Sequence, residues 1–135
     1  MNGTPTVQLR HDLPDGQWHV DWMLARDHDP GAELVTFRLE NRLDGLPSGT
    51  LIPGTRLADH RRTYLQFEGP LSDDRGHVQR LAEGCISKWV CHGDEWWINI
   101  RWNDGPSQII RVRVDGASDD CQVYVAESSL RGSSS

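Results

Sequence analysis

The sequence predicts an all-β protein, a small antiparallel β-barrel of about eight strands with little helix. Apolar and polar residues alternate with a period of two over most of the chain, which is the pattern of half-buried strands. Turn-forming pairs such as Asp15-Gly16, Gly93-Asp94 and Asp115-Gly116 interrupt this alternation at short intervals. Many short strands joined by tight turns favour a closed or nearly closed barrel.

The alternation sets the limits of the individual strands. The segments 95–102 and 107–114 flank an Asn-Asp-Gly-Pro turn and are predicted to form a hairpin. Residues 41–58 are the longest stretch without periodicity and are predicted to be a loop, with a single helical turn near 55–60 as the one helical candidate. The tail 128–135 is predicted to be flexible, which leaves residues 1–127 as one domain. The full set of predicted strands is 6–10, 17–26, 33–40, 63–68, 77–83, 86–92, 95–102, 107–114 and 121–127.

Composition narrows the class of protein. The 135 residues carry a net charge of −6, which argues against a broad electrostatic footprint on duplex nucleic acid but permits a grip on one phosphate. No apolar run approaches the roughly 18 residues of a membrane span, and the first residues do not resemble a signal peptide. We therefore expect a cytoplasmic location and no membrane partner. The three cysteines lack zinc-site spacing and are predicted to be reduced and mostly packed thiols.

The predicted strand 17–26 has two very different faces. Its apolar row is Trp18, Val20, Trp22 and Leu24, while its other row begins with His19 and Asp21 and continues with Met23. An imidazole and a carboxylate on one face can hold a divalent cation of the Mn or Zn kind. A solvated strand face explains the same pattern without any metal.

Two further stretches add candidate groups. His11 ends the preceding predicted strand, and the turn at 14–16 would return it beside His19, either as a third metal ligand or as a loop residue. His60 lies amid Arg56, Arg61 and Arg62, a locally positive segment that suits an oxyanion or is simply a basic loop at the barrel rim. Tyr64 follows His60 by four residues and is predicted to begin the polar row of its strand.

These stretches together resemble the 3′-phosphoesterase module at the N-terminus of bacterial DNA repair ligase D, and resemble its short stand-alone bacterial relatives more closely. The resemblance implies a β-barrel with a Mn-type site at one end and removal of 3′-phosphates or 3′-ribonucleotides from DNA. It implies that His11, His19 and Asp21 are metal ligands, that His60 contacts the scissile phosphate and that Tyr64 is catalytic. The motifs that carry it are HDLPDGQWHVDWML, ADHRRTYLQFEGP and RGHVQRLAEG.

One departure from the family pattern bears on phosphate binding. Met23 stands where the family has an Arg that helps to hold the phosphate, so another guanidinium must offset the phosphate charge. Arg38, on the polar row of the predicted strand 33–40, is the first candidate for this role, and Arg61 is the second.

The implied cofactor and partners follow from the resemblance. Mn²⁺ is the expected metal, with Zn²⁺ or Co²⁺ as alternatives, and the expected partners are DNA or RNA/DNA 3′ ends, with a DNA repair ligase or end-joining proteins as further candidates. We expect a monomer. Two other functions stay open: a non-catalytic relative that only binds metal, phosphate and nucleic-acid ends, and a Trp-rich carbohydrate-binding barrel.

Overall fold

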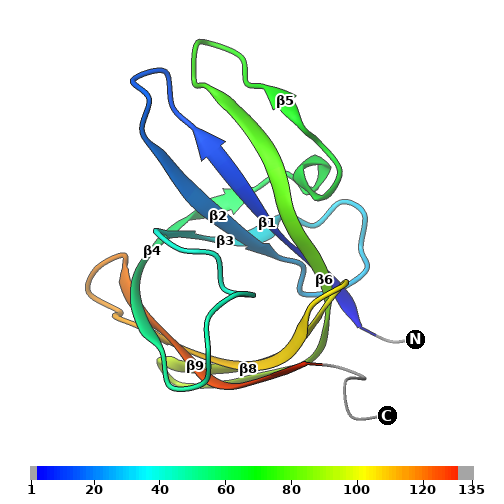
Figure 1. The fold of residues 1–135 in the computed structure, drawn as a ribbon, viewed down its shortest axis with the longest axis vertical. Coiled ribbons are helices and arrows are strands. Elements are labelled where there is room, and N and C mark those ends of the chain that lie inside the picture. Colours follow the sequence, from blue (N-terminus) through cyan, green and yellow to red (C-terminus); the bar gives the residue numbers. More distant parts are fainter. Residues whose placement is uncertain (1–2, 131–135) are drawn as a thin grey trace.

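The protein is one antiparallel sheet that closes on itself, seen in a computed structural model that describes residues 3–130 (Figure 1). β1 pairs with both β2 and β6, so eight strands form a ring in the order β1-β2-β3-β4-β9-β8-β7-β6, and β5 pairs with the edge of β6. The predicted all-β barrel of about eight strands is therefore confirmed. The elements are β1 (Thr4–Asp12), β2 (Trp18–Leu24), β3 (Leu34–Leu39), β4 (Leu51–His60), the 3-10 helix η1 (Arg62–Leu65), β5 (Gly69–Pro70), β6 (His77–His92), β7 (Glu95–Trp102), β8 (Pro106–Val114) and β9 (Asp120–Leu130).

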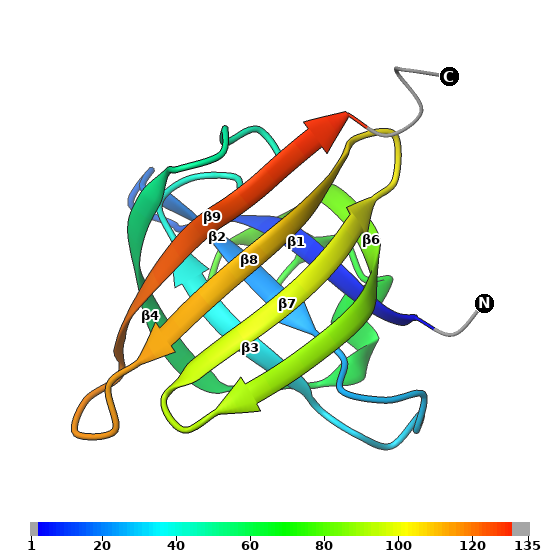
Figure 2. The same cartoon turned by 90° about the horizontal axis from the view of Figure 1, so that it is seen from below.

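The main core fills the inside of this ring. β7, β8 and β9 lie side by side along one wall (Figure 2), and their alternate residues point inward. From the opposite wall, Val20, Trp22 and Leu24 of β2 reach the same core. Trp18, predicted to belong to this packing row, is instead 46% exposed beneath the Arg10 guanidinium, 4.4 Å from its ring centroid. The row leaves the core at Trp18 because β2 begins there, beside the exposed turn.

Three predicted elements differ from the observed ones. Most of the second half of the predicted loop 41–58 is β4, where Gly54 permits close packing, since a Cβ there would lie 2.9 Å from a Leu39 methyl carbon. No helical turn forms at 55–60. The predicted strands 77–83 and 86–92 are a single strand, β6, because Gly84 marks a close approach to Trp102 rather than a turn.

The predicted strand 63–68 is also wrong. Its first half is the 3-10 helix η1, because Tyr64, Leu65 and Phe67 all turn toward one apolar cluster instead of alternating between two faces. At the end of the chain, β9 continues to Leu130, so residues 128–130 belong to the sheet and not to a tail. Residues 131–135 of the predicted tail lie outside the described part of the chain.

The connection between β3 and β4 reaches back into the core. Leu43 is fully buried there, and its backbone is held at both ends: its N–H donates to the Gln8 side chain at 2.7 Å, and its carbonyl accepts from Gln108 at 2.8 Å. Buried Gln108 also accepts a 2.8 Å hydrogen bond from the Trp102 indole. These amides satisfy polar groups that would otherwise be costly in an apolar core. Within residues 3–130, no helix is long and apolar enough to cross a membrane.

A second apolar cluster lies on the other face of β1 and β2. Because side chains alternate along a strand, residues next to the core row of β2 point away from the barrel interior. This outer face is covered by the segment from η1 to the loop before β6. The cluster contains Val7, Leu9, Met23, Ala25, Leu34 and Val78, with Tyr64, Leu65, Phe67 and Leu71 packed against it. The polar pair His19 and Asp21 lies on this covered face, which makes it a buried row rather than a solvated one.

Candidate metal and phosphate site

Two imidazoles and one carboxylate converge at the turn end of β1 and β2. His11 pairs with His19 across the two strands, and Leu9 pairs with Asp21, so all three polar side chains leave the outer face together. One donor atom from each of His11, His19 and Asp21 lies within 4.8 Å of the others. His19 Nε2 is 3.0 Å from Asp21 Oδ1, and His11 Nδ1 is 3.5 Å from Asp21 Oδ2. The three predicted ligands are thus brought together.

The two closest polar atoms in this cluster lack hydrogen-bond partners. His19 Nε2 and Asp21 Oδ1 are both buried, and neither has a hydrogen-bond partner, so their 3.0 Å contact lacks hydrogen-bond geometry. A buried polar atom without a partner costs free energy. A divalent cation between the two atoms would satisfy both, and imidazole nitrogen with carboxylate oxygen suits Mn, Zn or Co. The residues therefore fit the metal that the resemblance implies.

A backbone carbonyl orients the third candidate ligand. His11 Nε2 donates a 2.8 Å hydrogen bond to the carbonyl of Arg75, which leaves Nδ1 turned toward Asp21. A backbone acceptor behind an imidazole is the usual way in which proteins fix the tautomer of a metal ligand. Sequence reasoning missed Arg75, because it is 64 residues from His11 and no pattern in the chain shows that its loop packs there.

The electrostatics of the triad keep the Asp21 carboxylate charged. The Asp21 carboxylate raises the pKa of His11 above its ordinary value, in spite of partial burial. Burial raises the pKa of Asp21, but the neighbouring imidazoles of His11 and His19 outweigh burial and hold that pKa below its usual range. Asp21 is therefore ionised at neutral pH, and a buried carboxylate that stays charged is a strong attractor for a metal ion.

A cavity of about 270 Å³ opens beside the triad and gathers the other predicted residues. His11 and Asp21 line it together with His60, Arg61 and Tyr64. Arg75 adds a second guanidinium, and Met23 supplies an apolar wall where the family pattern has its Arg. The cavity thus places two Arg and two His side chains around one small space, together with the carboxylates of Asp21 and Asp59. Its guanidiniums suit a phosphate group once a cation offsets the charge of Asp21.

His60 is held in one orientation within this cavity. Its Nδ1 donates a 2.8 Å hydrogen bond to the Ala58 carbonyl, so Nε2 is the nitrogen left for a ligand. The Tyr64 ring packs edge-to-face against His60, with ring centroids 5.8 Å apart. Tyr64 lies on η1 and not on the predicted strand, yet it lines the predicted site.

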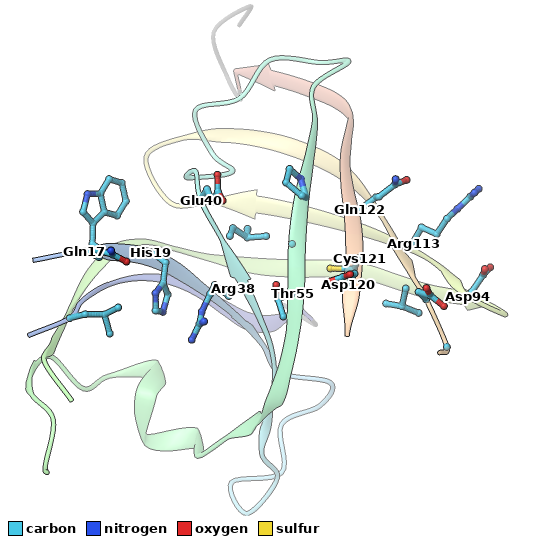
Figure 3. Close-up of a pocket in the computed structure, with 18 residues that line it drawn as sticks. Gln17, His19, Arg38, Glu40, Thr55, Asp94, Arg113, Asp120, Cys121 and Gln122 are labelled. Atoms are coloured by element: carbon cyan, nitrogen blue, oxygen red, sulfur yellow. The ribbon is translucent and has the colours of Figure 1, made fainter. Parts of the chain in front are cut away.

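Arg38 lies on the other side of the triad. It is the cross-strand neighbour of Asp21, and it lines a second and larger cavity of about 930 Å³ together with His19. Figure 3 shows the His19 and Arg38 side chains next to each other at one end of this cavity. The two predicted phosphate-binding residues, Arg38 and Arg61, therefore flank the triad from different cavities.

The cysteines take no part in the site. Cys121 is buried, and burial raises the pKa of its thiol to about 11, so the thiol is neutral at physiological pH. Cys85 and Cys91 are free and lie on β6, outside both cavities. Of the three thiols predicted to be mostly packed, Cys121 is buried, Cys85 is half-buried and Cys91 is exposed.

Comparisons with known proteins name no family for this chain. No protein-family model matches it, and no curated protein matches it either. The resemblance to the 3′-phosphoesterase module therefore rests on the three short motifs. The geometry described above is independent of that resemblance, because the triad and its cavities come from the fold alone.

Proposed function

We propose that this protein is a divalent-metal-dependent phosphoesterase that removes a terminal phosphate from a 3′ end of DNA, as its motifs suggest. The observation that carries the proposal is the pair of buried, unpartnered atoms, His19 Nε2 and Asp21 Oδ1, which face each other at 3.0 Å. That pair adjoins the cavity that holds His60, Tyr64 and Arg61. A metal site by itself would explain the pair, and the Arg61 and Arg75 guanidiniums of the cavity beside it support phosphate chemistry.

Each residue has a definable task in this reaction. A divalent cation held by the triad would neutralise charge on the phosphate oxygens. Arg61 and Arg38 add hydrogen-bonding charge from the two sides of the triad. Water forms a new bond to phosphorus while the bond from phosphorus to the 3′ oxygen breaks. His60 Nε2, which is free because Nδ1 donates to Ala58, takes a proton from the attacking water, and the leaving 3′ oxygen takes a proton from solvent. The products are a 3′-hydroxyl and inorganic phosphate.

A non-catalytic binder is the second candidate, and Met23 is the observation that favours it. Met23 is buried in the second apolar cluster and lines the 270 Å³ cavity, so the position of the family Arg contributes no charge.

The carbohydrate-binding alternative gains no support. That function predicts a flat row of exposed tryptophans. The exposed tryptophans among residues 3–130 are Trp18 on β2 and Trp97 on β7, and these strands are not neighbours in the sheet.

The experiment that separates catalysis from binding uses end-labelled DNA with a 3′-phosphate, and thymidine 3′-monophosphate, each with Mn²⁺ and excess enzyme. We expect both to lose phosphate with the wild type. His19→Ala should reduce the rate by at least about a hundredfold, because the metal site loses a ligand.

His92→Ala is the matched control. His92 is an exposed imidazole at the end of β6, outside both cavities, so its loss should leave the rate unchanged within about twofold. A wild-type protein that binds Mn²⁺ but leaves the phosphate on both compounds would contradict the enzyme proposal in favour of the binder.

A further inference from the structure

The larger cavity carries information about the substrate that the motifs do not. It has a volume of about 930 Å³, within the range of sites that enclose a small molecule. His19 and Arg38 lie at one end, and Asp94 and Arg113 lie at the other, with Thr55 between them (Figure 3). A ligand whose phosphate sits at the triad can therefore extend its body along this cavity, which we call the β3–β4 groove.

The charge of the groove changes along its length. Arg38 stands next to the triad, and no ion pair joins it to a carboxylate within residues 3–130. The other guanidinium of the groove, Arg113, is already 3.4 Å from the Glu95 carboxylate. The remaining charged side chains that line the groove are all carboxylates: Glu40, Asp94, Asp115 and Asp120. Glu95 is shared with Arg111, which lies closer to it at 2.7 Å, so Arg113 keeps part of its charge uncompensated. Beyond Arg38 the groove is lined by one guanidinium and four carboxylates, which makes that part of it acidic.

This gradient is unsuited to a nucleic-acid strand. A strand carries one negative charge per nucleotide, and proteins that bind strands place Lys and Arg along the path of the backbone. A strand laid in the β3–β4 groove would instead bring its further phosphates toward the carboxylates that line the groove, Asp115 and Asp120 among them. Like charges at close range are repelled, and the net charge of −6 adds to this effect.

We propose that the substrate is a small phosphomonoester with a single phosphate on a neutral or amine-bearing body, of the size of a mononucleoside 3′-phosphate. Its phosphate lies at the triad and Arg38, and its body lies in the β3–β4 groove. This inference rests on the proposed phosphoesterase function for the position of the phosphate. It narrows that function, because an internal strand of DNA is a poor fit and only its terminal nucleoside matches the groove.

The test compares thymidine 3′-monophosphate with a twelve-nucleotide single-stranded DNA that has the same 3′-phosphorylated thymidine. Phosphate release by the Mn²⁺-loaded protein is measured at low and at moderate salt. We expect kcat/KM to be at least about tenfold higher for the mononucleotide at low salt. Added salt should narrow this ratio, because screening weakens the repulsion of the longer strand. Equal or better turnover of the oligonucleotide, with a rate that falls as salt rises, would overturn the inference.

A charge variant tests the groove itself. Asp115→Asn with Asp120→Asn removes two carboxylates that line the groove and should shift the ratio toward the oligonucleotide by at least about threefold. The matched control, Asp104→Asn with Glu127→Gln, removes the same charge from exposed positions outside the groove and should leave the ratio unchanged. An equal shift in both double variants would mean that net charge, and not the groove, selects the substrate, which overturns the inference.

The two proposals fail in different ways. If neither compound loses phosphate, the phosphoesterase function is wrong, and both compounds are then stable ligands whose affinities can be compared by calorimetry. Tighter binding of the mononucleotide would still support the small-ligand groove. Equal or tighter binding of the oligonucleotide would overturn it.

Discussion

Asp21 is the residue at which the stability of the metal-free protein and the binding of a metal are most directly opposed. Its carboxylate is buried, faces two imidazoles, and has one oxygen without a hydrogen-bond partner. Burial opposes the charge of this carboxylate, and without a cation the unpartnered oxygen has nothing to offset its lost hydration. The side chain thus suits the metal-bound state at the expense of the metal-free one.

We therefore expect Asp21→Asn to affect the metal-free protein and the Mn²⁺-bound protein in opposite ways. At pH 8 and without metal, the amide can donate to the imidazole nitrogens, so we expect the free energy of unfolding to stay the same or rise by about 1 kcal/mol. With Mn²⁺, the variant should lose the metal-dependent rise in melting temperature and at least about tenfold in affinity. Thermal unfolding with and without Mn²⁺ measures both. A variant that is less stable than the wild type without metal would show that Asp21 is a structural residue.

Sequence reasoning located this residue but missed its surroundings. The period-two alternation placed His19 and Asp21 on one face, and the turn at 14–16 placed His11 beside them, because both rules depend on neighbours along the chain. The burial of that face depends on residues 61–76, which cross over it from a distant part of the sequence. Arg75 was missed for the same reason, since its carbonyl meets His11 only through the tertiary fold.

At the scale of elements, the loop before β6 is the part that positions the site. Leu71 N–H donates to the Gly76 carbonyl at 2.7 Å, which closes the loop, and Arg75 then offers its carbonyl to His11. Gly76 has φ of +93°, and a Cβ there would collide with the Asp12 carbonyl on β1. The loop can approach β1 this closely only with glycine at position 76.

Gly76→Ala should therefore damage both stability and metal binding. The collision with Asp12 pushes the loop away from β1, and the Arg75 carbonyl then loses its position behind His11. We expect a loss of more than about 2 kcal/mol in the free energy of unfolding and at least about tenfold in Mn²⁺ affinity. Denaturant unfolding and metal titration measure the two effects.

Gly16→Ala is the matched control for this variant. Gly16 has a similar φ of +88°, but a Cβ there would meet nothing within 4 Å. The control should cost about 1–2 kcal/mol from backbone strain and leave Mn²⁺ affinity unchanged. If both variants lose the same stability and keep their metal affinity, the loop does not position His11.

The elements that were predicted wrongly share a physical cause. β4 contains Pro53 and Gly54, which read as loop residues, but the glycine lets β3 and β9 pack closely against it. Tyr64 and Phe67 read as a strand, yet η1 turns both toward the second apolar cluster. In each case a tertiary contact decides the local conformation, and propensity along the chain does not report such contacts.

At the scale of the whole molecule, the protein has two apolar clusters of unequal size on the two faces of β1 and β2. The main core lies inside the barrel and is independent of the triad. The second cluster joins β1 and β2 to the segment from η1 to the loop before β6, and it borders the triad through Leu9 and Met23. The segment 61–76, which covers the second cluster and is called the cover below, should therefore unfold locally more easily than the barrel. A bound metal should hold the cover in place.

This coupling predicts where Mn²⁺ slows hydrogen exchange. Metal binding fixes His11, which is bonded to the Arg75 carbonyl, so peptides from 61–76 and 6–12 should gain protection. A ligand at a hundred times its Kd stabilises the bound state by about 2.7 kcal/mol, which limits the slowing to roughly a hundredfold. Local exchange in β7 and β8, which lie on the far wall of the barrel, should change little. Exchange followed by mass spectrometry, with Asp21→Asn as the variant that cannot respond, measures the pattern. Equal slowing in all peptides would mean that the cover and the barrel open as one unit, and that the second cluster is part of the main core.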